Sequence, residues 1–431
     1  MKRPGLMLSL YRAMSPLLVR TVPVAARFSP KLQQGVKGRR DIMDRLLGQA
    51  DRLRGGVWFH VTSVGEYEQA RPVIEAVKAR HPDLPVAVTH FSPSGYDFAL
   101  KRPCADLHDY LPFDHPGDMR TLMAAWQPRL LVFVKFDLWP NLVLAADQQD
   151  VPLCLVAGSL APSSARLHPV ARPMYRDLFN RFAQLGVCTE DDRRRFVEDL
   201  QVTCPVTVAG DTRVEQVILR YEAAQDGPIA EHLKKLSGRL LILGSTWPPD
   251  ENLWLPVLQE LLAATPDLRL VLTPHEPATE RLEALEKELA SQDIPGVRLS
   301  RFLEQDASAD HPARVILVDS IGHLAEIYRS GHLAYVGGSF TTGVHNTMEP
   351  AVARMPVLFG PRISNAEEAG VLVKRQAGWV VTRPEEALAR ARELLDNPQA
   401  LAAAGQEARQ VVLDQRGATV RSMELIQPFL K

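Results

Sequence analysis

The stretch that decides the fold is VWFHVTSVGE, residues 57–66, where a β-rich run leads directly into a short polar turn. A helix with periodic apolar residues is expected from Gln69 onward. A buried run, a turn and a helix in this order are typical of a βαβ unit, in which the helix returns the chain to a neighbouring parallel strand. The same alternation continues along the chain and predicts an α/β protein built on parallel sheets.

Ten β-rich runs of this kind fall into two series. The first series comprises Val57–Val61, Pro85–Thr89, Leu130–Phe136, Pro152–Ala157 and Pro205–Ala209. The second comprises Arg239–Leu243, Leu268–Thr273, Arg314–Val318, Leu333–Val336 and Pro356–Phe359. Neither series opens with a GxGxxG turn. We therefore expect a ligand in a cleft between two doubly wound domains, at the carboxyl ends of the strands.

The domain boundaries follow from a change in composition between the two series, where the apolar runs lapse into polar, charged sequence. We expect a first domain at residues 31–215, a linker at 216–238 and a second domain at 239–405. The Ala- and Arg-rich end of the chain predicts closing helices. The last of these, at residues 406–431, could pack back across the first domain.

Composition excludes several classes of protein. The 431 residues suggest two or three domains of about 150 residues each. The chain is 46% hydrophobic and 23% charged, and no window reaches the ~18 uninterrupted apolar residues of a spanning helix. Disordered, collagen-like and multi-span membrane proteins are thereby excluded. The four cysteines are far apart, without a CxxC pair or a His at metal spacing, which indicates a reducing compartment and no structural zinc.

The first 40 residues carry nine Lys or Arg and no Asp or Glu, although the net charge of the chain is −1. Such an imbalance suits an anionic membrane surface. A helical projection of residues 1–30 places Met7, Leu10, Tyr11, Met14, Leu18 and Val22 on one face and Ser9, Arg12, Pro16 and Arg20 on the other. We expect this amphipathic segment to lie on a membrane, kinked or divided at Pro16 and Pro23. Packing on the protein's own core is the alternative.

Two polar positions in the first domain are candidates for chemistry. Glu66 lies at a strand-to-helix turn, where it could act as a general base or could simply cap the first turn of the helix. Lys135 and Asp137 lie at the end of a buried strand, where charges are costly unless they are paired or used. An ion pair of Lys135 with a carboxylate and a functional role are both open there.

The second domain offers several polar loops after its strands. Ser245 and Thr246 precede a helix start and could bind phosphate, although such residues also cap ordinary helices. His275 ends the next strand, where an isolated histidine can also be a surface residue. The longest polar stretch begins at Gly337-Gly338, whose backbone can approach an anion closely, and continues to His345-Asn346 and Glu349. Several such loops at strand ends favour a nucleotide-like ligand.

With these pieces in order, the chain resembles the 3-deoxy-D-manno-octulosonic acid (Kdo) transferases of lipopolysaccharide synthesis. The resemblance covers most of the chain and rests on an ordered set of motifs after the basic amphipathic start. These are Ser63-Val64-Gly65-Glu66, Leu138-Trp139-Pro140-Asn141-Leu142, Gly244-Ser245-Thr246, Gly337-Gly338, His345-Asn346 with Glu349-Pro350-Ala351, and Gly360-Pro361. The family implies the GT-B fold, with two doubly wound, Rossmann-like domains facing a central cleft.

The resemblance also implies an activity and a location. Family members transfer Kdo from CMP-Kdo to a lipid A precursor (lipid IVA), with inversion at the anomeric centre and without a metal or other cofactor. They lie at the inner membrane and face the cytoplasm, so the implied partners are the anionic membrane surface, CMP-Kdo and the lipid precursor, and no nucleic acid. The cleft-facing loops identified above contain no Asp-x-Asp metal motif.

Residue roles carry over by motif. The resemblance makes Glu66 the base, with Ser63, Gly65 and Asp137 on the acceptor side. The implied CMP-Kdo contacts are Ser245, Thr246, Pro274, His275, Ile321, Gly322, His323, Gly337, Gly338, Asn346, Thr347, Met348 and Glu349. Two further catalytic positions differ from the common family pattern, because Lys135 replaces a Glu and Arg213 stands where a stabilising Lys is usual.

Other departures from the family pattern are His275 in place of Arg, Thr347-Met348 in place of Pro-Leu, and one glycine fewer before His345. Two rival interpretations remain open. One is another GT-B enzyme, either one that uses a UDP-sugar or an epimerase on the same scaffold, which predicts a preference for uridine. The other is a non-catalytic membrane-bound scaffold, which predicts CMP binding without turnover.

Overall fold

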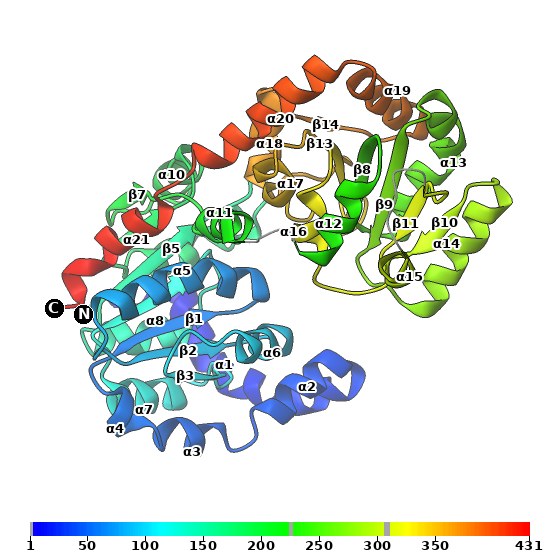
Figure 1. Cartoon of the computed structure of the whole chain (residues 1–431). Helices are drawn as coiled ribbons and strands as arrows, with labels where there is room; N and C mark the ends of the chain where they lie inside the picture. Colours follow the sequence, from blue (N-terminus) through cyan, green and yellow to red (C-terminus); the bar gives the residue numbers. More distant parts are fainter. Residues whose placement is uncertain (1–2, 224–226, 306–310) are drawn as a thin grey trace. The chain divides into compact units, whose positions relative to one another are not determined.

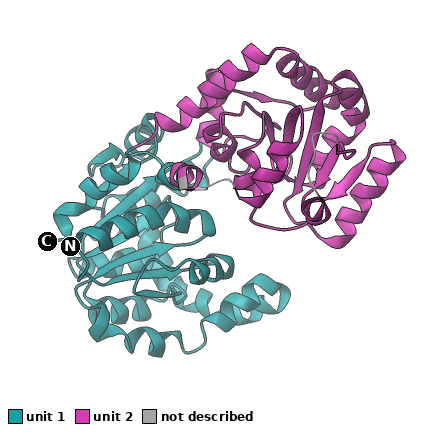
Figure 2. Cartoon of the chain, in the orientation of Figure 1, with its two compact units in different colours: residues 1–216, 417–431 teal, residues 217–416 magenta. Residues whose placement is uncertain are grey.

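The computed structural model describes residues 3–223, 227–305 and 311–431. The chain forms two compact units, residues 1–216 with 417–431 and residues 217–416 (Figure 2). Each unit contains one seven-stranded sheet, and the paired strands run parallel throughout both sheets. The predicted α/β fold with two doubly wound units is confirmed.

The sheet of the first unit has the strand order β3-β2-β1-β4-β5-β6-β7. Its strands are β1 (Val57–Val61), β2 (Val86–His90), β3 (Leu107–Tyr110), β4 (Leu130–Val134), β5 (Leu153–Gly158), β6 (Gln184–Val187) and β7 (Val206–Val208). The order reverses between β1 and β4. At such a switch point the loops that follow the two strands diverge and leave a crevice at the carboxyl ends.

Helices cover both faces of this sheet (Figure 1). They are α1 (Leu6–Ala25), α2 (Pro30–Gly38), α3 (Ile42–Leu47), α4 (Ala50–Leu53), α5 (Val64–Arg80), α6 (Pro93–Lys101), α7 (Pro116–Trp126), α8 (Pro140–Gln148), α9 (Arg172–Phe179), α10 (Glu190–Arg194), α21 (Ala418–Ile426) and α11 (Arg213–Ala223), which crosses the unit boundary. Val57 and Phe59 of β1 pack in one core with α5 and α21, whereas Trp58 packs in the other with α7 and α8. Burial on both faces explains why these strands read as nearly continuous apolar runs.

The second sheet repeats this plan with the order β10-β11-β9-β8-β12-β13-β14. Its strands are β8 (Arg239–Thr246), β9 (Leu268–Pro274), β10 (Gly296–Arg298), β11 (Val315–Leu317), β12 (Leu333–Val336), β13 (Val357–Phe359) and β14 (Gly378–Val380). The order reverses between β8 and β12. This second switch point places the loops after β8, β9 and β12 at one edge of the sheet.

The helices of the second unit also form two layers. They are α12 (Pro228–Lys235), α13 (Pro248–Ala264), α14 (Thr279–Ser291), α15 (Leu299–Glu304), α16 (Leu324–Tyr328), α17 (Met348–Val352), α18 (Glu367–Lys374), α19 (Pro384–Leu395) and α20 (Pro398–Leu413). Alternate residues of β8 enter opposite cores: Leu241 and Leu243 pack with α13 and α19, and Leu240 and Ile242 pack with α12 and α16.

The residues expected to form a polar linker, 216–238, are mostly helical, because α11 and α12 occupy much of this range. The apolar residues of α11 recur at helical spacing, and Val214, Val217 and Ile218 are buried. A charged overall composition hides this period, which is why the segment was expected to be irregular. Residues 224–226 lie outside the described part of the chain.

At the two ends of the chain, the points at which the helices are divided differ from those expected, whereas the last helix packs on the first unit as expected. Helix α1 is one continuous helix and is not divided at Pro16. Pro16 has no N–H to donate to the Arg12 carbonyl, and this carbonyl accepts instead from the Ser15 hydroxyl at 3.2 Å. At the other end, Gly417, with φ of +89°, separates α20 from α21. Met423 and Ile426 of α21 then pack in the core that contains α5.

The apolar side chains that α1 presents are largely exposed. Leu8 and Ser15 are buried, whereas Leu10 is 57% exposed, Leu17 64% and Leu18 49%. Tyr11 anchors the helix, because its hydroxyl donates to Asp114 Oδ2 at 3.0 Å. Among the described residues, no helix has the length and apolar character required to cross a membrane.

Candidate active site

The switch point of the first unit brings together the turn after β1 and the turn after β4. Glu66 lies in the first turn of α5, 3% exposed, and its Oε2 accepts from the Thr62 amide at 2.6 Å and from the Thr62 hydroxyl at 2.7 Å. Ser63 caps the helix, with its hydroxyl accepting from the Glu66 amide at 3.3 Å. Gly65 faces open space, since a Cβ there would meet nothing within 4 Å.

These contacts bear on the two roles open for Glu66. Oε2 does accept a backbone N–H near the helix start, but Ser63 is the residue that caps the helix. Oε1 accepts no hydrogen bond from any described residue. One carboxylate oxygen is therefore fixed by Thr62, while the other can accept a proton from a ligand.

The surroundings of Glu66 weaken its acidity. Burial raises the pKa of Glu66 to about 7, and the negative charge of Asp137 acts in the same direction. The hydrogen bonds from Thr62 and the charge of Lys135 oppose this rise in pKa. A carboxylate with a pKa near neutrality is suited to accept a proton from a hydroxyl group at neutral pH.

Asp137 interacts with Thr62 and Arg166. The Thr62 hydroxyl lies 2.9 Å from Asp137 Oδ2, and Arg166 forms an ion pair with Oδ1. The expected alternative of an ion pair between Lys135 and a carboxylate is wrong for the described residues, because β4 ends at Val134 and Lys135 turns out of the sheet with φ of +68°. The Lys135 ammonium lies 5.1 Å from the centroid of the Phe136 ring.

A cavity of about 480 Å³ reaches these residues from α2 and α6. Its lining includes Lys31, Arg39, Thr62, Ser63 and Asp137, together with Ser92 at the start of α6. The cavity thus has positive groups and helix N-termini on one part of its wall and a carboxylate on another. Such a wall can accept an acidic, hydroxyl-bearing ligand.

Arg39 is a buried cation of this wall. Its guanidinium donates to the carbonyl oxygens of Leu111 at 2.7 Å, Phe91 at 2.8 Å and Gly35 at 3.0 Å. It also lies 4.6–4.8 Å from the ring centroids of Phe91, Tyr110 and Phe113. Burial lowers the pKa of Arg39 to about 10. Arg39 also lines the cavity, and the negative charge of Asp109 acts on it.

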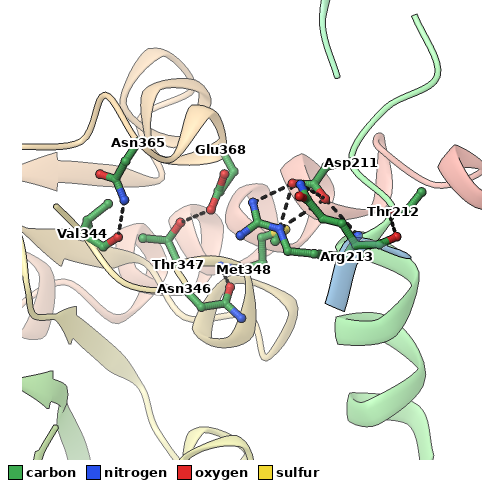
Figure 3. Close-up of polar contacts among 10 residues, drawn as sticks. Asp211, Thr212, Arg213, Val344, Asn346, Thr347, Met348, Asn365 and Glu368 are labelled. Atoms are coloured by element: carbon green, nitrogen blue, oxygen red, sulfur yellow. Dashed lines mark hydrogen bonds and ion pairs between the residues drawn. The ribbon is translucent and has the colours of Figure 1, made fainter. Parts of the chain in front are cut away.

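Arg213, at the start of α11, is paired within its own loop (Figure 3). Its guanidinium binds Asp211 at 2.6 Å, and this cation holds the pKa of Asp211 below its usual range. Gln69 of α5 donates to the same carboxylate at 3.2 Å, and the Thr212 hydroxyl donates to the Gln69 carbonyl. The loop is therefore tied to α5, and a catalytic role for Arg213 stays a prediction.

In the second unit, the turn after β8 uses its hydroxyl and N–H groups internally. The Thr246 hydroxyl donates to Glu251 at 3.0 Å, and the Trp247 amide donates to Asp250 at 2.8 Å. The first two residues of α13 are prolines, which have no N–H. The start of α13, which was expected to bind phosphate, therefore offers few free donors. The backbone of Ser245 is left-handed, with φ of +52°.

The Gly337-Gly338 pair lets the loop after β12 fold tightly. A Cβ at Gly337 would lie 2.4 Å from the Ser245 carbonyl oxygen, and one at Gly338, where φ is +93°, would lie 2.6 Å from His345. The Gly338 amide donates to Asp250 at 3.0 Å, and the Tyr335 hydroxyl donates to the other oxygen of Asp250 at 2.6 Å. These glycines thus serve close packing around a buried carboxylate.

Three aromatic rings gather at the ends of β8, β9 and β12. The centroid of His275 lies 4.8 Å from that of Trp247 and 4.4 Å from that of His345, with an interplanar angle of 10° between the two imidazoles. Trp247 Nε1 donates to His345 Nε2 at 3.0 Å. His275, which follows Pro274, is exposed, so this array presents an aromatic and imidazole surface to solvent.

The segment from Asn346 to Glu349 forms the start of α17 (Figure 3). The Asn346 side chain accepts from the Met348 amide at 3.0 Å, and the Thr347 hydroxyl donates to Glu368 at 3.4 Å. Thr347 and Met348 are buried, whereas Asn346 and Glu349 are half-buried. Asn346 and Glu349 are therefore the members of this segment that are accessible to a ligand.

Residues Ile321, Gly322 and His323 form a turn after β11. Ile321 is 79% exposed, and Gly322, with φ of +98°, has open space where a Cβ would lie. His323 is half-buried at the start of α16. Since the strands are parallel, this turn lies at the same edge of the sheet as the loops after β8, β9 and β12.

Several residues of both sites carry no sequence signal that could have identified them. Arg166 lies 29 residues from its partner Asp137, and Arg39 is recognisable only through the rings around it. Trp247 and Asp250 lie at the start of α13, a position that by itself indicates only a helix start. Among the described residues, no group of three or more His, Cys, Asp or Glu side chains is arranged to hold a metal ion.

Comparison with known proteins shows which proteins the chain is similar to. Residues 35–216 match the family model of 3-deoxy-D-manno-octulosonic-acid transferase (kdotransferase). The chain is 28% identical over 391 residues to the 3-deoxy-D-manno-octulosonic acid transferase of Haemophilus influenzae, covering 87% of both chains. It is also 28% identical over 389 residues to the enzyme of that name from Chlamydophila psittaci, covering 86% of this chain and 85% of the relative.

A solved structure supports the fold. The UDP-GlcNAc 2-epimerase from Neisseria meningitidis bound to UDP-GlcNAc has a TM-score of 0.63 and 12% identity, covering 86% of this chain and 100% of that chain. This likeness concerns architecture alone and agrees with the GT-B class. Taken together, the matches show that the chain is similar to 3-deoxy-D-manno-octulosonic acid transferases over most of its length.

Proposed function

We propose that the protein transfers Kdo from CMP-Kdo to a lipid A precursor, lipid IVA, with inversion at the anomeric carbon. The observation that carries this proposal is the arrangement at Glu66, where one oxygen is held by Thr62 and the other is open, in a setting that raises the pKa of the carboxyl to about 7. A buried carboxylate of this kind is suited to deprotonate an acceptor alcohol.

The proposed reaction is a single displacement. Glu66 Oε1 accepts the proton of the acceptor hydroxyl while the oxygen of that hydroxyl forms a bond to the anomeric carbon of Kdo. The bond from that carbon to the phosphate oxygen breaks, and CMP leaves with the bonding electron pair. Attack opposite the leaving group inverts the centre. Ser63, Gly65 and Asp137 are proposed to line the acceptor position, since Ser63 and Asp137 border the 480 Å³ cavity.

Donor binding is assigned to the second unit. His275, His323, Asn346 and Glu349 are half-buried or exposed at one edge of its sheet, where a nucleotide can reach them. A departing CMP carries less charge than a nucleoside diphosphate. We therefore propose that the imidazole groups of this unit stabilise it without a metal ion. Catalytic roles for Lys135 and Arg213 of the first unit remain proposals from the resemblance.

We also propose a location at the cytoplasmic face of the inner membrane, and the first helix supports contact with a membrane surface. Its exposed leucines could enter the acyl layer while Arg12 and Arg20 contact lipid phosphates. The alternative expected for this segment, packing of the apolar face on the protein's own core, accounts for Leu8 and not for the exposed Leu10, Leu17 and Leu18. The acceptor lipid would then reach the protein along the membrane.

The deciding experiment is incubation of the full chain with CMP-Kdo and tetra-acylated lipid A precursor, followed by mass spectrometry of the lipid. A gain of one or more Kdo residues, with release of CMP, is expected. UDP-sugars in place of CMP-Kdo test the rival glycosyltransferase or epimerase. CMP binding without any product from a folded protein would favour the scaffold and contradict the proposal.

A further inference from the structure

Thr62 lies between the two carboxylates of the first unit. Its hydroxyl oxygen is 2.7 Å from Glu66 Oε2 and 2.9 Å from Asp137 Oδ2, and both distances are typical of a hydrogen bond. A hydroxyl has one hydrogen, and an ionised carboxylate has none to donate. While both carboxylates are ionised, only one of them can therefore receive the hydrogen of Thr62.

The three side chains are held in place by other contacts. Glu66 Oε2 also accepts from the Thr62 amide at 2.6 Å, and Asp137 Oδ1 forms an ion pair with Arg166. The guanidinium of Arg166 in turn lies 4.1 Å from the centroid of the Phe136 ring. Rotation of the Thr62 hydroxyl about its C–O bond is therefore the smallest movement that changes which carboxylate receives the hydrogen.

The hydroxyl favours Glu66 while this residue is ionised. Glu66 is 3% exposed, whereas the side chain of Asp137 is 35% exposed and already has Arg166 as a partner. A buried charge without enough hydrogen bonds is the more costly of the two. The hydrogen of Thr62 consequently belongs to Glu66 in this state.

A proton on Glu66 Oε1 reverses this preference. Oε2 is then the oxygen of a neutral carboxyl group, and it keeps the hydrogen bond from the Thr62 amide. Asp137, as the ion-pair partner of Arg166, is now the ionised acceptor within reach of the hydroxyl. Hydrogen bonds to an ionised acceptor are the stronger ones, so the hydroxyl turns to Asp137.

The other charged groups of this region do not bind the hydroxyl. The charge of Lys135 lowers the pKa of Glu66, and that of Asp137 raises it. Among the described residues, Thr62 Oγ1 forms hydrogen bonds with the carboxylates of Glu66 and Asp137 only. The remaining charged side chains of the region are Lys31 and Arg39 in the cavity wall, and Asp211 and Arg213, which pair with each other before α11.

We propose that Thr62 is a positioning residue that acts as a hydrogen-bond switch: its hydroxyl donates to Glu66 while this base is ionised and turns to Asp137 once Glu66 has accepted the proton of the acceptor alcohol. No bond of Thr62 breaks, and the transferred proton stays on Glu66 Oε1. The step in which an alcohol supplies the proton rests on the proposed function. The switch itself is a property of the ligand-free protein.

A switch has a different electrostatic signature from a fixed donor. A fixed donor stabilises only the ionised form of Glu66, so its removal raises the pH at which Glu66 titrates. A switch donates to a carboxylate in both states, so its removal changes this pH little as long as Asp137 is charged. Neutralising Asp137 abolishes the balance, because the hydroxyl then has a strong acceptor only when Glu66 is ionised.

The switch is tested by a double-mutant cycle on the ligand-free full chain. ¹³C NMR of glutamate labelled at the side-chain carboxyl carbon follows the titration of Glu66, whose signal is assigned from Glu66→Gln. Asp137→Asn should lower the midpoint in the presence of Thr62. In the Thr62→Val background this shift should be about 0.5–1 pH unit smaller, because an amide is a weaker acceptor than a carboxylate. Thr62→Val alone should change the midpoint little.

Two further variants control the cycle. Thr62→Ser keeps the hydroxyl, and Thr121→Val removes a hydroxyl from the exposed surface of α7. Both should titrate like the unmodified protein. Thr62→Ala repeats the cycle with a smaller side chain, so that the result does not depend on how valine fits the turn, and melting curves check that each variant is folded.

Transfer gives a second measurement. Thr62→Val should lower kcat about tenfold with KM nearly unchanged, as expected when the base loses one hydrogen bond. Thr62→Ser should restore most of the activity. A Thr62→Val protein with normal kcat would overturn the positioning role.

The outcomes separate this inference from the proposed function. Equal Asp137→Asn shifts in both backgrounds, with a raised midpoint for Thr62→Val alone, would show a fixed donor and overturn the switch, whether or not the protein transfers Kdo. Unequal shifts in a folded protein that transfers no Kdo would support the switch and contradict the proposed function.

Discussion

The carboxylates of Glu66 and Asp137 share one hydroxyl, because Thr62 Oγ1 lies 2.7 Å from Glu66 Oε2 and 2.9 Å from Asp137 Oδ2. A hydroxyl has a single hydrogen and can donate to only one of the two at a time. Burial and the negative charge of Asp137 both raise the pKa of Glu66, so its protonated form is favoured more than in water. The predictions for the first unit follow from this arrangement.

The pH dependence of transfer should report Glu66. Since the base must be deprotonated, kcat/KM is expected to rise with pH through an apparent pKa of about 7. Asp137→Asn removes a charge that raises this pKa and should move the rising limb to lower pH. Lys135→Met removes a charge that lowers it and should move the limb to higher pH. Shifts of both variants in one direction would contradict the electrostatic account.

Replacing the base should separate chemistry from binding. Glu66→Gln is expected to lower kcat by about 10²–10⁴-fold, the usual contribution of a general base, while the affinity for CMP stays nearly unchanged. Glu68→Gln, on the same first turns of α5, is the control and should retain activity. A folded Glu66→Gln protein with normal turnover would remove Glu66 from the mechanism.

The same substitution should stabilise the protein at high pH. The folded-state pKa of Glu66 lies above its unfolded value, so stability falls as pH rises from about 4.5 through about 7. The Glu66→Gln variant does not lose stability in this way. Its free energy of unfolding at pH 8 should be about 1–3 kcal/mol higher than that of the unmodified protein. Urea denaturation at pH 4 and pH 8 measures the difference, which should vanish at the lower pH.

Arg39 should be important for stability as well as for acidic ligands. Arg39→Met removes a donor from the carbonyl oxygens of Gly35 and Leu111, which are buried, and of Phe91, which is partly buried. The expected cost is about 2–4 kcal/mol in the free energy of unfolding, measured in urea. Arg40→Met, on the exposed neighbour, should change it by less than about 0.5 kcal/mol.

Membrane association should depend on exposed leucines of α1. Leu10→Glu and Leu17→Glu each place a charge on the proposed acyl-facing surface without disturbing buried Leu8. The affinity of each variant for anionic vesicles should fall at least tenfold, because burial of one leucine contributes about 1.5–3 kcal/mol. Leu219→Glu, at a comparably exposed leucine of α11, is the matched control. Equal vesicle binding by all three variants would refute the role of α1.

The sequence predicts the central parts of the fold better than its edges. Strands such as β1 and β8 are buried on both faces, so they appear as apolar runs bounded by turns. Four strands were not predicted, namely the edge strands β3, β10 and β14 and the interior strand β6, because runs of three or four residues leave no clear pattern. Helix α11 was missed since its charged residues mask the spacing of Val214, Val217 and Ile218.

The candidate sites divide in the same way. Glu66 and Asp137 could be found from the sequence because each follows a buried strand directly, and parallel strands end at one edge. Arg166 and Arg39 could not, since their partners are distant in the chain and no local pattern marks them. The hydrogen bond of Trp247 to His345, 98 residues away, depends on the left-handed Gly338 turn and so was visible only in three dimensions.

Helix α21 has a consequence for how the protein is made. The first unit includes residues 417–431, and Met423 and Ile426 complete the core beside α5. A ribosome will have synthesised the whole second unit, residues 217–416, before these side chains emerge. The first unit therefore has an incomplete core until residues 417–431 have been synthesised, whereas the second unit can finish folding before that.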